Sequence, residues 1–200
     1  LDLETWKTLP ERQLSSGLAE TIKHACLADG EMFDYLEKNI EKILVNDKDA
    51  CEYIAEHNCA VKYKVVMKDE RESGLREVLN LGHTVGRAIE TVSDYKLLHG
   101  EAVSIGLIAQ AKLGEKYGYI SPENVSRVIK LCERAKLPIA IPDYIDKTAL
   151  VRKLYTDKKV RDGKLRMVFQ KEIGDVMCFG DNDYAKQITE PEIAEVIDEM

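Results

Sequence analysis

The sequence predicts a mainly α-helical chain, folded as a helical bundle, with a small β-hairpin near residues 164–179. In the first two-thirds of the chain, apolar residues recur at spacings of three and four, which is typical of amphipathic helices. Capping and turn residues separate these segments. After residue 163, polar and apolar residues alternate, which favours a strand. A length of 200 residues suits about one domain, so we expect a single helical domain over residues 1–200.

The first predicted helices follow one another closely. An early helix is expected over about residues 14–28, and Asp29-Gly30 marks the turn that ends it. The next helix starts at Glu31 and has apolar residues on one face with charged residues between them. Its apolar residues are Phe33, Leu36, Ile40, Ile43 and Leu44. Residues 48–68 are expected to form a further helix.

The middle of the chain predicts two more helices. Residues 75–92 repeat apolar positions at helical spacing, which favours one continuous helix. This segment contains Gly82 and Gly86, and a glycine in a helix interior costs roughly 1 kcal/mol. We therefore expect a ligand or another backbone to approach closely at these glycines. Residues 100–113 are apolar on nearly every side, so this helix should lie buried in the middle of the bundle.

The last third of the chain begins and ends with helices. Ser121-Pro122-Glu123 supplies an N-cap, a proline at the first helical position and an acidic first turn, and this helix should end before Pro138. Another helix is expected over about residues 147–155. Thr189 and Glu192 form a capping box for a final helix.

The alternating segment between these helices predicts the hairpin. Residues 164–169 form its first strand, and Ile173-Gly174-Asp175 supplies turn residues. Residues 176–179 are the candidate partner strand.

Composition argues against several classes of function. The chain is 44% hydrophobic and 32% charged, which gives enough apolar material for a core. Its formal net charge is −7 and it has no long basic run, which argues against nucleic acid as a partner. No apolar stretch reaches the roughly 20 residues that cross a bilayer, and the first residues resemble no signal peptide. We expect a cytoplasmic protein with no membrane partner.

Two nucleotide-binding patterns and a cysteine pattern are missing from the sequence. The 12 glycines include no GxG, so neither the dinucleotide fingerprint GxGxxG nor the phosphate loop GxxxxGK[ST] occurs. The five cysteines are scattered and form no CxxC pair, so we interpret them as thiols rather than as disulfides or zinc ligands. A first residue other than Met is compatible with a fragment.

One histidine lies in the predicted helix over residues 75–92. On that helix, one stripe would carry two guanidinium groups, an amide and an imidazole. These belong to Arg76, Asn80, His83 and Arg87. The stripe could bind a ligand, or it could be a solvated face with one chance histidine, and spacing alone favours neither interpretation.

A second histidine, His99, opens the apolar helix and could ligate an ion, cap the helix or fill a polar hole in the core. Glu20 shares a helix face with Lys23 and His24, as a functional site or as an ordinary solvent-side ion pair. Catalytic zinc typically takes three protein ligands of the His and Glu type. Glu20, His83 and His99 would supply such a set, but their spacing leaves open whether they converge.

Several motifs occur in a fixed order over about residues 8–160. They are residues 9–12 (LPER), 17–23 (GLAETIK), 69–76 (DERESGLR), 79–84 (LNLGHT), 99–103 (HGEAV) and 157–159 (DKK). Together these motifs resemble the C-terminal half of the 3-dehydroquinate synthase family. The resemblance implies the helical C-terminal domain of the dehydroquinate synthase-like fold.

The resemblance also implies an activity and partners. The family is a lyase that converts 3-deoxy-D-arabino-heptulosonate 7-phosphate into 3-dehydroquinate and phosphate, in the shikimate pathway of aromatic amino-acid biosynthesis. Its N-terminal Rossmann-like domain binds NAD, and its helical domain holds a divalent metal, zinc or cobalt, and much of the substrate site. We expect that N-terminal domain to be absent from this chain, the chain alone to be inactive, and the parent protein to be a homodimer.

Matching motif to motif, the resemblance implies roles for individual residues. Glu20, His83 and His99 are the expected metal ligands. A cationic clamp would hold the carboxylate and phosphate of the sugar-acid substrate. The residues expected to bind the substrate are Lys62, Arg76, Asn80 and a lysine of the Lys158-Lys159 pair. Lys23, Glu72 and Arg87 are the expected catalytic residues.

Arg87 departs from the family pattern, which has a second histidine here that helps to relay a hydroxyl proton. An arginine is permanently charged and cannot act as a base at neutral pH. Either Arg87 binds an anion while water and Glu72 relay the proton, or the enzyme is slower or uses another substrate. The first interpretation is favoured because the other motif positions match.

Two alternatives to a 3-dehydroquinate synthase stay open. Another sugar-phosphate cyclase on the same scaffold, such as one that makes a cyclitol, is compatible with Arg87, whereas Arg76 and Asn80 favour dehydroquinate. A helical interaction module that has lost catalysis is the other, and the intact Glu20, His83 and His99 argue against it.

Overall fold

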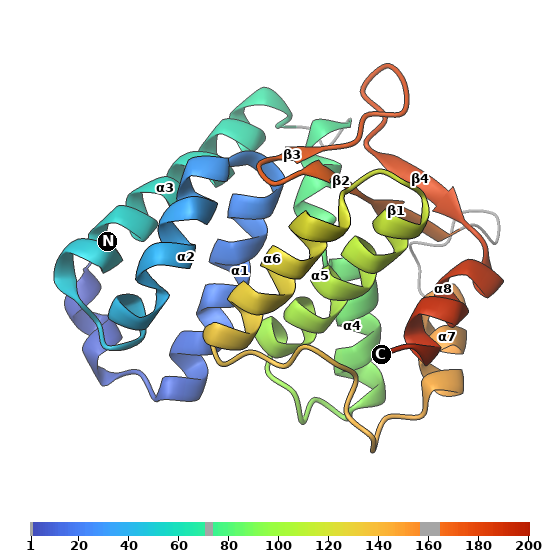
Figure 1. Ribbon diagram of the computed structural model, residues 1–200, viewed down its shortest axis with the longest axis horizontal. Coiled ribbons are helices and arrows are strands. Elements are labelled where there is room, and N and C mark those ends of the chain that lie inside the picture. Colours follow the sequence, from blue (N-terminus) through green and yellow to red (C-terminus); the bar gives the residue numbers. More distant parts are fainter. Residues whose placement is uncertain (1, 71–73, 157–164) are drawn as a thin grey trace.

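Helices form most of the molecule, and a small β region runs along one edge, with β2 and β3 near α1 and α5 and with β1 and β4 toward α7 and α8 (Figure 1). The computed structural model describes residues 2–70, 74–156 and 165–200. The helices are η1 (Leu3–Thr8), α1 (Glu11–Ala28), α2 (Gly30–Leu44), α3 (Lys48–Lys68), η2 (Leu75–Asn80), α4 (His83–Val92), α5 (His99–Lys116), α6 (Pro122–Arg134), α7 (Lys147–Thr156) and α8 (Glu190–Asp198). The strands are β1 (Leu165–Val168), β2 (Gln170–Glu172), β3 (Asp175–Val176) and β4 (Ala185–Ile188). The prediction of a mainly α-helical bundle with a small β-hairpin is confirmed.

Side-chain caps explain where two of the outer helices begin. Asp29 Oδ1 accepts a hydrogen bond from the backbone N–H of Met32 at 2.9 Å, so α2 starts directly after α1 ends. Asp47 caps α3 in the same way, through the N–H of Ala50 at 3.0 Å. The helix predicted over residues 48–68 is confirmed at both ends.

The prediction of one helix over residues 75–92 is wrong. The structure has the 3₁₀-helix η2, then a break at Leu81 and Gly82, then α4. Gly82 has a φ of 77°, in the left-handed region that favours glycine, and it precedes His83, the first residue of α4. An apolar repeat does not detect this break because apolar residues remain buried on both sides of it.

Helix α5 lies at the centre of the bundle and is buried along almost its whole length, as predicted for residues 100–113 (Figure 1). It meets its neighbours α1 and α4 at glycines. A Cβ atom on Gly106 would lie 2.0 Å from the carbonyl oxygen of Gly82, and one on Gly100 would lie 1.8 Å from that of Ser16. Two backbones are therefore in direct contact at each crossing. The sequence predicted the close approach of a ligand or of another backbone, and the structure shows that it is another backbone.

The β region differs from the prediction in its pairing. Strand β1 pairs antiparallel with β4, with Leu165 opposite Ile188, rather than with residues 176–179. The hairpin around Gly174 joins β2 to β3 and is short. The residues that follow β1 most closely form this β2–β3 hairpin. The strand that pairs with β1 is therefore β4, which lies farther along the chain.

Two clusters of buried apolar side chains lie on either side of α5. The first combines α1, α2, α3 and α6 with Leu107 and Ile108 of α5. The second combines α4, α7, α8 and β1 with Ile105 and Ala109 of α5. Helix α5 is therefore the shared wall of both cores.

Two further findings concern the described part of the chain. No helix there has both the length and the apolar character to span a bilayer. The cysteines are free thiols, of which Cys26, Cys51 and Cys132 are buried, in agreement with the interpretation of the sequence.

Candidate metal centre

Three side chains from three helices converge where α1, α4 and α5 meet. Glu20 lies on α1, and His83 and His99 are the first residues of α4 and α5. Glu20 Oε1 lies 3.5 Å from His83 Nε2 and 3.6 Å from His99 Nε2. One ligand atom from each residue lies within 4.8 Å of the others. The structure thus brings together the three residues whose convergence their spacing in the sequence left open.

The atoms of this cluster suit a divalent metal ion. Glu20 Oε1 is buried and accepts no hydrogen bond from the part of the chain that the structure describes, an arrangement that is costly unless another group satisfies the oxygen. Two ligands of a tetrahedral ion, each about 2.1 Å from it, lie about 3.4 Å apart. The two distances from Glu20 Oε1 are close to that spacing. Two imidazoles and one carboxylate also form a donor set found in catalytic zinc sites.

Lys23 holds the other oxygen of the Glu20 carboxylate. Its Nζ donates to Glu20 Oε2 at 2.7 Å and to the carbonyl oxygen of Leu79 at 3.2 Å. The Lys23 side chain is only 3% exposed, so this is a buried contact and the solvent-side ion pair weighed for Glu20 and Lys23 is excluded. Burial alone would raise the pKa of Glu20, but the charge and hydrogen bond of Lys23 outweigh it and lower that pKa.

Burial and the charge of Lys23 lower the pKa of His83 to about 4. At neutral pH the His83 imidazole is therefore uncharged. A histidine must be in this state to donate a lone pair to a metal.

The two imidazoles are also held at their outer nitrogens. His83 Nδ1 lies 3.2 Å from the carbonyl oxygen of Leu81, and His99 Nδ1 lies 3.2 Å from Glu90 Oε2. The sequence motifs give no role to Glu90. The only signal in the sequence is its place two turns after His83, on the face of α4 that carries this histidine.

The start of α5 has a second anchor that the sequence analysis missed. Glu101 Oε2 accepts from the backbone N–H of Leu98 at 2.8 Å, and Arg12 donates to both Glu101 oxygens at 2.6 and 2.7 Å. Arg12 lies in the LPER motif and Glu101 in the HGEAV motif, but neither motif predicts this contact, because Leu98 has no polar side chain that would mark the start of a helix. This contact fixes the turn that carries His99.

The described residues that are expected to bind the substrate lie on α3 and η2, which carry none of the three converging ligands. Arg76 and Asn80 are on η2, so the predicted single stripe with His83 and Arg87 does not exist, because the chain breaks at Gly82.

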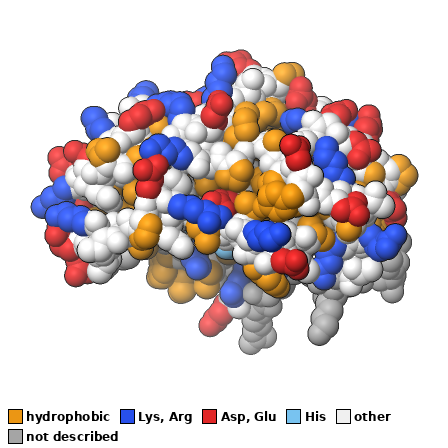
Figure 2. All heavy atoms as spheres, turned by 90° about the horizontal axis from the view of Figure 1, so that it is seen from below, with side chains coloured by type: hydrophobic (Ala, Val, Ile, Leu, Met, Phe, Trp, Pro, Cys, Tyr) orange, Lys and Arg blue, Asp and Glu red, His pale blue; other side chains and the backbone are white. Residues whose placement is uncertain are grey.

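Lys62 on α3 and Arg87 on α4 are exposed. Burial lowers the pKa of Lys23, and the positive charges of Lys62 and Arg87 lower it further. In Figure 2, basic side chains lie beside a small exposed patch of histidine. Glu72, Lys158 and Lys159 lie outside the described residues.

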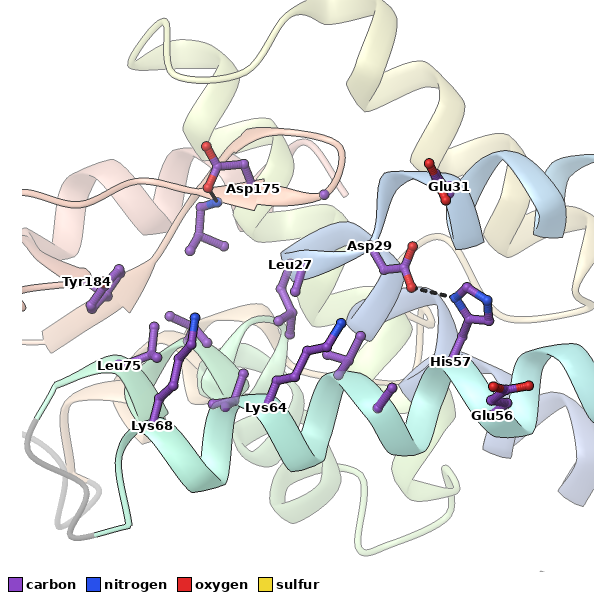
Figure 3. Close-up of a pocket in the computed structure, with 17 residues that line it drawn as sticks. Leu27, Asp29, Glu31, Glu56, His57, Lys64, Lys68, Leu75, Asp175 and Tyr184 are labelled. Carbon is purple, nitrogen blue, oxygen red and sulfur yellow. Dashed lines mark hydrogen bonds and ion pairs between the residues drawn. The ribbon is translucent and has the colours of Figure 1, made fainter.

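A separate hollow of about 610 Å³ opens between α3 and the β2–β3 hairpin (Figure 3). Lys64 and Lys68 of α3 line it, and His57 pairs with Asp29 at 2.7 Å at its edge. None of the three converging ligands lines this hollow. It is therefore distinct from the candidate metal centre.

Comparisons with known proteins agree with one another. A family model described as "3-dehydroquinate synthase C-terminal" matches residues 17–160. The chain is 46% identical to 3-dehydroquinate synthase of Methylococcus capsulatus over 87% of this chain and 49% of that protein. It is 42% identical to the enzyme of that name from Aliivibrio fischeri over 100% of this chain and 54% of that protein. The chain spans about half the length of these curated relatives.

Solved structures of related cyclases share the fold. ValA, a 2-epi-5-epi-valiolone synthase from Streptomyces hygroscopicus with NAD⁺ and Zn²⁺ bound, matches 98% of this chain and 53% of its own, with 26% identity and a TM-score of 0.85. A 2-deoxy-scyllo-inosose synthase complexed with carbaglucose-6-phosphate, NAD⁺ and Co²⁺ matches 96% of this chain and 54% of its own, with 21% identity and a TM-score of 0.78. The second likeness concerns the fold alone.

Proposed function

The chain belongs to the 3-dehydroquinate synthase family, and from this premise we propose that it is the metal- and substrate-binding domain of a 3-dehydroquinate synthase. The parent enzyme, a lyase of the shikimate pathway, converts 3-deoxy-D-arabino-heptulosonate 7-phosphate into 3-dehydroquinate and phosphate. The route is a transient oxidation, elimination of phosphate and an internal aldol closure. The proposed site of action is the cytoplasm.

One observation carries the metal site of this proposal. Glu20 Oε1 is buried, has no hydrogen-bond partner among residues 2–70, 74–156 and 165–200, and lies near the Nε2 atoms of His83 and His99. Glu20, His83 and His99 would hold a divalent ion, zinc or cobalt. When bound, such an ion supplies a positive charge that acidifies substrate hydroxyl groups, and NAD supplies reversible oxidation at a substrate carbon.

The chain's own residues orient the substrate and neutralise its charges. Lys23 keeps the Glu20 carboxylate ionised and fixed. Lys62, Arg76 and Asn80 bind the carboxylate and phosphate of the sugar acid, together with Lys158 or Lys159. Among the described residues, Lys62 lies on α3 and Arg76 and Asn80 lie on η2, so the substrate would bind across at least two elements.

Arg87 replaces a histidine of the family and serves as an anion-binding group rather than as a base. A guanidinium is permanently charged and cannot act as a base at neutral pH, and the charge of Arg87 contributes to lowering the pKa of Lys23, after burial. Glu72 and water then relay the hydroxyl proton.

The parent enzyme needs partners that this chain does not supply. A preceding NAD-binding domain completes the site, and the parent enzyme is a homodimer. Two facts support a missing part: the chain covers about half of its relatives, and it has no GxG fingerprint for NAD.

The proposed function is tested by phosphate release from 3-deoxy-D-arabino-heptulosonate 7-phosphate in the parent protein with NAD and zinc. We expect turnover, one bound zinc or cobalt ion per chain, and loss of both in His99→Ala. No release from this substrate, with turnover of another sugar phosphate, would identify a related cyclase instead. The structural likeness to ValA and the presence of Arg87 favour that second candidate.

The role of Arg87 is tested separately by Arg87→His. An anion-binding Arg87 predicts a raised KM for the sugar phosphate and at most a small change in kcat. A large gain in kcat would show that the position needs a base.

A further inference from the structure

The two histidines of the cluster, His83 and His99, differ in the exposed fraction of their side chains. The His83 side chain is only 11% exposed and its outer nitrogen faces a backbone carbonyl. The His99 side chain is 48% exposed. Packing alone therefore restrains the His99 ring less, and a specific contact has to set its orientation.

Glu90 makes that contact. Its carboxylate, with the side chain 18% exposed, places Oε2 3.2 Å from His99 Nδ1, while the other ring nitrogen faces Glu20. Among the described residues, His99 is the only side chain that pairs with this carboxylate. The imidazole thus lies between two carboxylates, one at each nitrogen.

We propose that Glu90 is a positioning residue for His99: its carboxylate accepts a hydrogen bond from Nδ1–H and so leaves the lone pair of Nε2 free to face the proposed ion. This inference rests on the metal site proposed above. Glu90 touches neither the proposed ion nor the substrate. It acts through the ring that it orients.

The number of protons that the imidazole ring carries supports this assignment. A neutral imidazole carries one proton, and a metal ligand must keep that proton off the ligating nitrogen. With Nε2 as the ligating atom, the proton belongs on Nδ1, where it needs an acceptor. A carboxylate acceptor at this place fixes the tautomer and makes the ligating nitrogen more basic.

The backbone explains how Glu90 reaches His99. The α4–α5 crossing has glycines on both helices, and a Cβ on Gly86 would lie 3.0 Å from the carbonyl oxygen of Ala102. At such a short separation, a glutamate on α4 can reach the first residue of α5. A wider crossing would leave the carboxylate too far from the ring.

Nitrogen NMR of the metal-free parent protein tests the tautomer, at a pH above the range in which histidine protonates. We expect the Nδ1–H form for His99 in the wild type and a mixture of tautomers in Glu90→Ala. An Nε2–H form in the wild type would overturn the proposal. The tautomer of His99 can be measured without bound metal and without enzymatic activity. A general loss of stability would not by itself change this tautomer.

Zinc affinity, measured by competition with a chelator, is the second test. We expect Glu90→Gln and Glu90→Ala to weaken binding about 10- to 100-fold, with the larger loss in the alanine variant. Glu37→Gln is the matched control, because Glu37 is a half-buried carboxylate paired with Arg127 at 2.6 Å on an outer helix. Its zinc affinity should equal that of the wild type.

The two tests separate the inference from the proposed function. If the wild type binds no zinc, the proposed metal site fails, whatever the tautomer of His99. If the wild type binds zinc and both Glu90 variants bind it equally well, the metal site stands and the role of Glu90 is wrong.

Discussion

The inner crossing of α1, α4 and α5 and the outer layer of α2, α3 and α6 are held together by different means. At the inner crossing, backbone meets backbone, at Gly106 against Gly82 and at Gly100 against Ser16. In the outer layer, apolar side chains such as Ile40 fill the space, and ion pairs join the helices at the surface.

This difference indicates which contacts set the geometry of the candidate metal centre. A side-chain contact can repack when one residue changes, whereas a backbone contact leaves no atoms that can move aside. The inner crossing carries Glu20, His83 and His99. We therefore expect the metal centre to be sensitive to changes at the crossing and insensitive to changes in the outer layer.

The largest effect is expected from Gly106→Ala at the crossing. The new methyl group would lie 2.0 Å from the carbonyl oxygen of Gly82 and 2.7 Å from the amide nitrogen of Gly86, so α4 and α5 must separate. We expect a loss of about 3 kcal/mol or more in the free energy of unfolding, and weaker zinc binding. Urea unfolding and a zinc titration measure the two quantities.

Gly17→Ala is the control for that experiment. Gly17 also lies in a helix, but a Cβ there has no neighbour within 4 Å. This change should stabilise the protein by about 0.5–1 kcal/mol. Equal losses in the two variants would contradict the role of the crossing.

Ile40→Ala tests the outer layer with a loss of comparable size. Ile40 on α2 is fully buried, so its truncation should cost about 2–5 kcal/mol. We expect zinc affinity to stay within twofold of the wild type as long as the protein remains folded. A parallel drop in zinc affinity would show that the outer layer also sets the site.

A pH-dependent effect is expected where the two regions join, at His24 of α1. His24 Nδ1 hydrogen-bonds to Asn58 Oδ1 on α3, and burial, followed by the charge of Lys23, lowers the pKa of His24. The unfolded chain takes up a proton near pH 6.5 while the folded chain resists it, so stability should fall as the pH drops below about 6.5.

Urea unfolding at pH 7.5 and pH 5.5 measures this effect. His24→Gln removes the titrating group, so its stability should fall less between the two pH values than that of the wild type. An equal fall in both proteins would exclude His24 as the cause.

The smallest effect is expected from Arg134→Ala on the outer surface. Arg134 pairs with Glu41 at 2.8 Å, but both side chains are well exposed to solvent. Such pairs contribute at most about 1 kcal/mol, so the free energy of unfolding should change by less than that. A thermal melt checks this, and a loss above about 2 kcal/mol would mean that surface pairs hold the outer layer together.

The sequence predicts the outer helices well because their signals are local. The alternation of apolar and charged residues in α2 and the cap at Ser121 of α6 act over a few residues, so both can be found without knowing the fold. The break at Gly82 was missed because it depends on the approach of α5, which is distant in the sequence. The partner of β1 was missed for the same reason, since register is decided across space.

The candidate site divides in a similar way. The motifs identify Glu20, His83 and His99 through a family resemblance, but only the structure shows that their ligand atoms converge. Lys23 is read from the sequence as part of a helix face, and its burial depends on α1 packing against η2. The sequence signals Glu90 only through its spacing from His83 on α4, and this spacing does not point to its partner His99, which lies on another helix.

The position of α5 between the two apolar clusters has a consequence for how the protein unfolds. Each cluster includes side chains of α5. Neither cluster can therefore unfold without exposing to solvent apolar side chains that the other cluster packs against. We infer that the two cores unfold in a single cooperative step, with no half-unfolded state in which one survives.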